Sequence, residues 1–78
     1  MVELSGRVIK QIIGKGTKSE HDAVLLETKD GNYVLRRRGG NPFRDPELDA
    51  LVGQRIRANG VLTAYTFVMT DWAVESEA

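Results

Sequence analysis

The amino-acid sequence predicts an all-β domain, a small five-stranded Greek-key barrel with one short helix between the third and fourth strands. Two observations lead to this prediction. Five segments have the alternation or the β-branched composition of strands, and polar or glycine-containing stretches separate them. Between the third and fourth lies a well-capped helical segment that is too short to be stable alone. It must therefore pack against something that the strands build.

The helix is predicted over residues 46–52. Asp45 can accept a hydrogen bond from the free amides of a first helical turn, and Pro46 suits the first helical position. Gly53 can take the left-handed conformation that commonly closes a helix. Three apolar residues share one helical face: Leu48, Leu51 and Val52. We expect these three side chains to plug one end of the barrel.

The first strand, over residues 4–13, changes the phase of its apolar positions. Leu4, Gly6 and Val8 alternate one way, whereas Ile9 and Ile13 belong to the other face. A long strand that coils, with a kink at Gly6 or near Lys10, can serve two sheets in turn and would show such a phase change. This is how a closed barrel begins.

The other four strands are predicted over residues 23–28, 33–36, 56–62 and 67–74. Asp30-Gly31 indicates a tight hairpin turn between the second and third, and residues 64–66 form the turn between the last two. Alternation places one set of fourth-strand residues on one face: Ile56, Ala58, Gly60 and Leu62. In the fifth strand, Phe67 and Met69 are predicted to face one way, and Val68, Trp72 and Val74 the other. Trp72 is expected to be a packing residue.

The whole chain resembles the OB-fold superfamily. The residues that carry the resemblance are the first strand with Gly6, the Asp30-Gly31 hairpin, and the run from Leu51-Val52-Gly53 into Arg55-Ile56-Arg57-Ala58-Asn59-Gly60. The Gly39-Gly40-Asn41-Pro42-Phe43 stretch and the ending from Tyr65 to Trp72 are similar to a group of short bacterial proteins of unknown function. The structural alternative is an SH3-like barrel, in which a helix capped this well would be unexpected. The resemblance implies one OB-fold-like domain over residues 1–78.

Composition predicts a soluble cytoplasmic protein. The chain has no cysteine, no signal-peptide pattern, and no apolar stretch near the roughly 20 residues that a membrane helix needs. Its 11 basic and 11 acidic residues balance, but all the basic residues lie within residues 1–57. Residues 75–78 form a polar, acidic tail. A basic face is compatible with this charge distribution, whereas a basic protein is not.

The sequence indicates neither an enzyme nor a cofactor or metal site. The segment from Gly14 to Ser19 lacks the spacing and the following helix of a phosphate-binding loop, so residues 14–22 are predicted to be a mobile polar loop. His21 is the only histidine and is expected to be a surface residue, because no cysteine or second histidine lies at ligand spacing. No nucleophile has an evident base beside it.

The cluster Arg36-Arg37-Arg38 is the most informative candidate site. If Tyr33 and Leu35 point inward, Arg36 and Arg38 point outward from the third strand, with Arg37 near the rim. In OB-folds the outer face of strands two and three, with the loops after strands one and four, binds oligonucleotides or oligosaccharides. In this chain the resemblance maps that region to five residues: Arg36, Arg38, Lys15, Lys18 and Tyr65.

Two hypotheses for the function follow from this cluster. In the first, the domain binds single-stranded nucleic acid, with the four cations on phosphates and Tyr65 stacking on a base. In the second, the same face or an open strand edge docks a protein partner or a second copy. The fold favours the first hypothesis; the zero net charge and the scarcity of aromatic residues favour the second. The arginines could also serve only to keep an open strand soluble.

Overall fold

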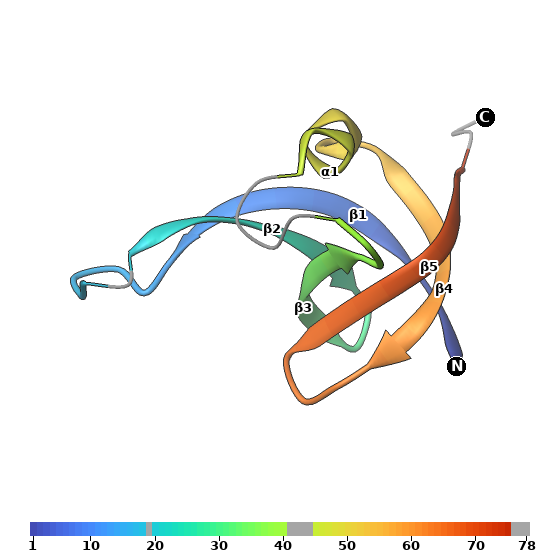
Figure 1. Ribbon diagram of the computed structural model, residues 1–78, viewed down its shortest axis with the longest axis horizontal. Helices are drawn as coiled ribbons and strands as arrows, with labels where there is room; N and C mark the ends of the chain where they lie inside the picture. The colour runs from blue at the N-terminus through green and yellow to red at the C-terminus, as the bar shows by residue number, and fades with distance from the viewer. Residues whose placement is uncertain (19, 41–44, 76–78) are drawn as a thin grey trace.

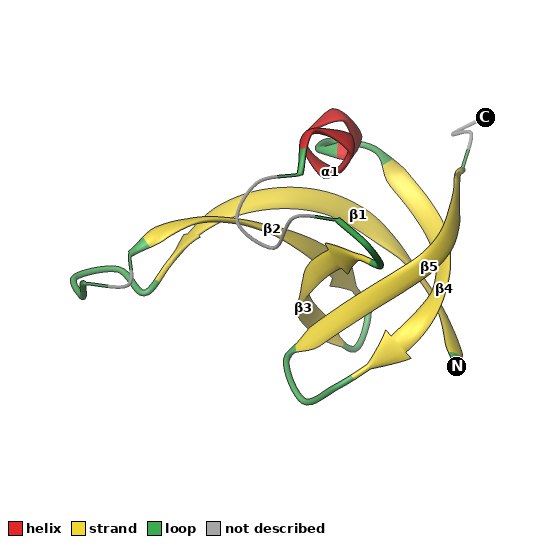
Figure 2. Ribbon diagram, viewed as in Figure 1, coloured by secondary structure: helices red, strands yellow, loops and turns green. Residues whose placement is uncertain are grey.

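The predicted barrel is confirmed by a computed structural model, which describes residues 1–18, 20–40 and 45–75. Figures 1 and 2 show its elements: β1 (Val2–Ile13), β2 (His21–Thr28), β3 (Gly31–Arg37), α1 (Pro46–Leu51), β4 (Arg55–Leu62) and β5 (Thr66–Val74). The strands close into a barrel in the order β1-β2-β3-β5-β4. The β3–β5 pair is parallel and the other pairs are antiparallel. Residues 41–44 and 76–78, which include part of the glycine-rich stretch and most of the predicted tail, lie outside the described residues.

The long strand β1 belongs to both halves of the barrel, as its phase change predicts. Residues 2–7 pair with β4, and residues 7–13 pair with β2. Gly6 lies next to this change of partner, and a Cβ atom there would overlap the backbone carbonyl of Glu27 on β2. A residue without a side chain therefore allows β1 to pass close to β2 at the point where it leaves β4.

The distal halves of β1 and β2 form an arm that extends away from the barrel (Figure 1). β2 begins at His21, two residues earlier than predicted, because Ile12 and Ile13 continue the ladder with Asp22 and His21. The loop at the end of the arm forms its own hydrogen bonds. Thr17 Oγ1 donates to the Gly14 carbonyl at 2.6 Å, and the Gly16 amide donates to Glu20 Oε2 at 3.2 Å. The described residues of this loop are exposed and contribute nothing to the core.

The core fills the barrel and extends beneath α1. Its buried members are Val8, Leu26, Leu35, Leu48, Leu51, Ile56, Ala58, Phe67 and Met69. Asp45 caps α1 as predicted, since its Oδ1 accepts a hydrogen bond from the Glu47 amide at 3.1 Å. The prediction that Val52 belongs to the plug is wrong. The helix ends at Leu51, so Val52 leaves the helical path and is 36% exposed.

A register shift between β4 and β5 corrects the predicted direction of Trp72. The shift falls at Asn59 and Gly60, so Met69 pairs with Gly60 while Trp72 pairs with Ala58. Because paired residues share a face, Trp72 packs against the core on the same side as Met69, not on the opposite side. Leu62 pairs with the buried Phe67, as its predicted face requires, but it is 37% exposed because it is the last residue of β4.

Two turns differ from their predicted positions by one residue. The hairpin between β2 and β3 turns at Lys29-Asp30, and Gly31 already belongs to β3 with a φ of 136°. Thr28 Oγ1 donates to the Gly31 carbonyl at 2.7 Å and accepts from the Asp30 amide, which holds the turn. Likewise, Thr66 is the first residue of β5. In the part of the chain that the structure describes, no helix is long and apolar enough to cross a membrane.

Candidate functional site

A cleft of about 730 Å³ lies where β2 and β3 separate. The β2–β3 ladder runs only from Thr28–Gly31 to Leu25–Val34. Beyond it, residues 21–24 pair with β1 alone, and residues 35–37 pair with β5. The arm and β3 thus form opposite walls of the cleft, and α1 forms its end. The described lining residues are Lys10, Ile13, His21, Asp22, Ala23, Val24, Val34, Leu35, Arg36, Arg37, Arg38, Gly39, Gly40, Asp45, Leu48, Asp49, Thr66 and Val68.

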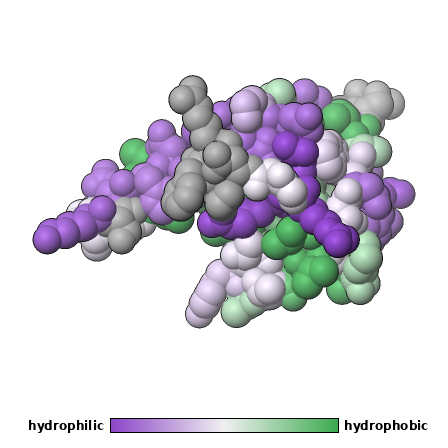
Figure 3. Space-filling model, viewed as in Figure 1, coloured by the Kyte–Doolittle hydropathy of each residue, from purple (hydrophilic) through white to green (hydrophobic). Residues whose placement is uncertain are grey.

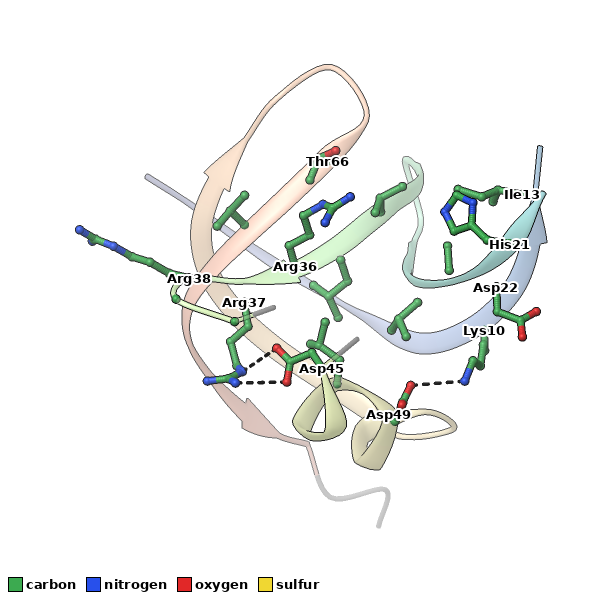
Figure 4. Close-up of a pocket in the computed structure, with 18 residues that line it drawn as sticks. Lys10, Ile13, His21, Asp22, Arg36, Arg37, Arg38, Asp45, Asp49 and Thr66 are labelled. Carbon is green, nitrogen blue, oxygen red and sulfur yellow. Dashed lines mark hydrogen bonds and ion pairs between the residues drawn. The ribbon is translucent and has the colours of Figure 1, made fainter. Parts of the chain in front are cut away.

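Alternation along β3 places Arg36 and Arg37 on opposite sides of the strand. Arg36 pairs with Val68 of β5, and Val34 pairs with Thr66, so these four residues share the outer face of the barrel. Figure 4 shows Arg36 and Thr66 on the side of β3 away from α1, and Arg37 on the side towards it. The outer side therefore combines a guanidinium with an apolar floor, which includes Val34 and Val68.

Arg37 joins β3 to the start of α1. Its Nε donates to Asp45 Oδ2 at 3.0 Å and its Nη2 donates to Oδ1 at 3.1 Å, which is the two-point geometry of a strong guanidinium–carboxylate pair. Glu47 lies 3.5 Å from the same Nε. The Asp45 side chain is only 3% exposed, and the hydrogen bonds from Arg37 hold its pKa below the ordinary value, against the opposing effect of burial. The same pair raises the pKa of Arg37.

Replacing Asp45 with asparagine is expected to destabilise the domain, because asparagine can still cap the helix but cannot pair with the Arg37 charge. The lowered pKa means that the carboxylate stabilises the fold fully above its unfolded pKa of about 3.9 and loses this effect as the pH falls through its folded pKa. The difference in urea midpoint between wild type and D45N should therefore be large at pH 7 and shrink below about pH 4.

The matched control for that measurement is Asp49→Asn. Asp49 Oδ1 lies 3.4 Å from Lys10 Nζ, but both side chains are nearly half exposed, so the pair should contribute about 0.2–1 kcal/mol. An equal and pH-independent loss in the two variants would contradict the role given to the Asp45 charge.

The structure brings only two of the five predicted site residues into the cleft. Arg36 and Arg38 line it, although the Arg38 side chain projects away from the other labelled residues in Figure 4. Lys15 and Lys18 lie in the loop at the end of the arm, whose surface is hydrophilic in Figure 3. Tyr65 lies in the loop before β5, is 81% exposed, and accepts a hydrogen bond from the Val34 amide through its carbonyl. Lys15, Lys18 and Tyr65 are not among the lining residues.

Seven polar residues of the described cleft lining were not among the predicted site residues: Lys10, His21, Asp22, Arg37, Asp45, Asp49 and Thr66. His21 and Lys10 lie on the arm, and Thr66 begins β5 beside Arg36. The sequence feature that could have revealed His21 is the apolar pair Ile12-Ile13 at the end of the first strand. Because β1 extends through these two residues, β2 must begin at His21 to pair with them. Thr66 is brought to the site by the parallel β3–β5 pairing, a long-range contact that no local pattern indicates.

The described lining residues of the cleft carry charges of both signs. Four cationic side chains face three carboxylates, and two of those carboxylates are already paired, with Arg37 and Lys10. No phenylalanine, tyrosine or tryptophan is among the described lining residues. Within residues 1–18, 20–40 and 45–75, no group of three or more metal-binding side chains is close enough to hold an ion.

Comparison with known proteins yields no match for this chain among protein-family models, curated proteins or solved structures.

Proposed function

We propose that the domain is an OB-fold that binds single-stranded nucleic acid across the outer face of β2 and β3. The observation that carries the proposal is the position of Arg36, which stands beside an apolar floor at the wall of the cleft. Arg38 follows β3 directly, two residues after Arg36, and supplies a second cation at the same wall of the cleft. In OB-folds this face is the usual site for oligonucleotides.

Each part of the surface has a role in this proposal. Arg36 and Arg38 contact phosphates, while Lys15 and Lys18 extend the cationic path along the arm. Tyr65, just before the first residue of β5, offers an exposed ring for base stacking, and its carbonyl is bonded to Val34 of the cleft. His21 adds a second planar side chain at the opposite wall. Arg37 belongs to the scaffold, because its guanidinium is bound to Asp45.

Arg36→Ala with Arg38→Ala is expected to weaken binding of all sequences alike, because phosphate contacts carry no sequence information. Wild-type affinity for a short mixed-sequence single strand should fall steeply between about 50 and 200 mM salt as counterions are released. In the double variant the slope of log affinity against log salt should flatten by about one to two units. Fluorescence anisotropy at several salt concentrations measures both quantities.

The matched control removes the same charge from another strand of the barrel. Arg55 and Arg57 lie on β4, where both pair with Glu75. The double variant R55A/R57A should keep the wild-type salt slope. An equal loss in the two double variants would show that bulk charge and not this face attracts the oligonucleotide. If adding the oligonucleotide to the wild-type protein at low salt changes no NMR chemical shift, nucleic-acid binding is excluded.

A further inference from the structure

The two walls of the cleft expose strand edges as well as side chains. No described strand pairs with residues 21–24 of β2 on the side away from β1, or with residues 35–37 of β3 on the side away from β5. Native proteins usually cover or disrupt such edges, because unpaired amides and carbonyls form a template for another strand. An open edge inside a cleft is therefore a feature to be explained.

The direction of the β3 backbone groups follows from two hydrogen bonds. The Val34 amide donates to the Tyr65 carbonyl at 2.8 Å, and the Arg38 amide donates to the Met69 carbonyl at 2.9 Å. Since backbone groups alternate sides along a strand, Leu35 and Arg37 direct their amides and carbonyls away from β5 and towards the cleft. The Arg37 carbonyl accepts from the Gly40 amide at 2.9 Å, so this wall is partly closed at its end.

The same alternation gives the direction of the β2 groups. Tyr33, one residue before Val34, must face β2, and its partner there is Leu26. Leu26 therefore faces β3, and so do Val24 and Asp22 at two-residue spacing. Beyond the end of the β2–β3 ladder, the amides and carbonyls of Val24 and Asp22 point into the cleft. Their spacing and direction match those of an added strand.

The side chains on either side of this edge indicate the composition of the occupant. A strand placed along residues 21–24 would turn alternate side chains towards α1, where Val24, Leu35 and Leu48 line the cleft. Its other side chains would turn outward, towards the wall that carries Arg36. On the α1 side, the carboxylates of Asp45, Glu47 and Asp49 outnumber the two described cations, Arg37 and Lys10. Acidic residues of a partner are therefore favoured on the outer side and apolar residues on the inner side.

We infer that the open edge of β2 accepts an extended peptide of a partner protein by strand addition, with apolar and acidic residues alternating along it. The backbone of Asp22 and Val24 supplies hydrogen bonds, and the side chains of the cleft supply selectivity. This inference does not depend on nucleic-acid binding, because its hydrogen bonds come from the backbone of the β2 edge. Arg36 is common to the two proposals.

A set of synthetic peptides tests the inference on the intact protein. The probe is an eight-residue peptide that alternates glutamate and valine. Two control peptides carry N-methyl groups on every second amide, one on the glutamate amides and the other on the valine amides. Strand addition predicts that the unmethylated peptide protects the Asp22 and Val24 amides from hydrogen exchange. It also predicts that the peptide methylated on the amides that face β2 binds at least about tenfold more weakly than the other methylated peptide, whose methyl groups face away from β2. Equal binding of the methylated peptides, or protection confined to other residues, would overturn the inference.

A pair of variants tests the same edge from the protein side. Asp22→Pro removes the amide that points into the cleft, whereas Asp22→Ala keeps that amide and removes a carboxylate that repels an acidic peptide. The proline variant should bind the peptide about tenfold more weakly, and the alanine variant at least as tightly as wild type. If D22P fails to fold, the peptide experiment with the wild-type protein tests the inference by itself. The Asp22 and Val24 amides could also become protected from hydrogen exchange when the protein is concentrated without peptide. That result would identify a second copy of the chain as the occupant and would overturn the assignment to a partner protein.

The two proposals fail separately. R36A/R38A should flatten the salt dependence of oligonucleotide binding, whereas D22P should leave it unchanged. If D22P weakens both ligands equally, the edge is a structural support for one shared site and not a docking strand.

Discussion

Replacing Leu51 with alanine is expected to lower the free energy of unfolding by about 2–5 kcal/mol, because the substitution leaves a cavity between α1 and the barrel. Leu51 is 8% exposed and belongs to the core cluster with Leu48 of the same helix. A small domain has about 5 kcal/mol of stability at the low end of the usual range, so much of the population would unfold. Urea unfolding at pH 7 measures the change.

Val52→Ala is the matched control for Leu51→Ala. Val52 follows Leu51 in the chain and was predicted from the sequence to share its role, but it points out of the core and is much more exposed. Its truncation should cost less than about 1 kcal/mol, in keeping with an exposed position. A melting temperature unchanged by Leu51→Ala would contradict the packing of α1 on the barrel.

Replacing Gly6 with alanine is expected to cost about 3 kcal/mol, because the new methyl group would overlap backbone atoms. The Cβ would meet the Glu27 carbonyl, which is fixed in the β1–β2 ladder and cannot move aside as a side chain could. Relief requires β1 and β2 to separate near Arg7, the residue that pairs with both β2 and β4. Loss of the amide protection of residues 7–9 should therefore accompany the loss of stability.

Gly16→Ala distinguishes this overlap from the general effect of removing a glycine. Gly16 has a φ of 82°, but no atom lies within 4 Å of the position where its Cβ would be. The cost should be limited to the strain of the left-handed conformation, about 1–2 kcal/mol. Two results together would contradict this explanation. They are an equal loss in the free energy of unfolding for Gly6→Ala and Gly16→Ala, and β1 amides that stay protected in Gly6→Ala. The close approach of β1 and β2 would then not be the reason for a glycine at position 6.

Sequence patterns predicted the elements whose causes are local. Asp45 and Pro46 identified the start of α1, because capping involves residues two or three positions apart. The alternation of Tyr33 and Leu35 with Arg36 predicted correctly that Arg36 lies on the outer face, because side-chain direction along a strand has a period of two. The phase change in the first strand predicted that β1 pairs with two different partners.

The same local patterns failed where a distant strand sets the geometry. Trp72 was assigned to the wrong face because the register shift opposite Asn59 reverses the alternation of β5, and nothing within β5 reveals it. Val52 was assigned to the core because the helical pattern continues past Leu51, whereas the chain must turn there to reach β4.

For this protein, the sequence by itself determined the order of the elements, the cap of α1 and the outward direction of Arg36, since all of these depend on neighbours along the chain. Only the tertiary structure decided that Arg37 pairs with Asp45, that Thr66 and His21 join Arg36 at one cleft, and that no described strand covers the β2 edge beyond Leu25. These features depend on where the barrel closes and where β2 leaves β3. Closure is the sum of many weak contacts between residues far apart in the chain, so no short pattern in the sequence records it.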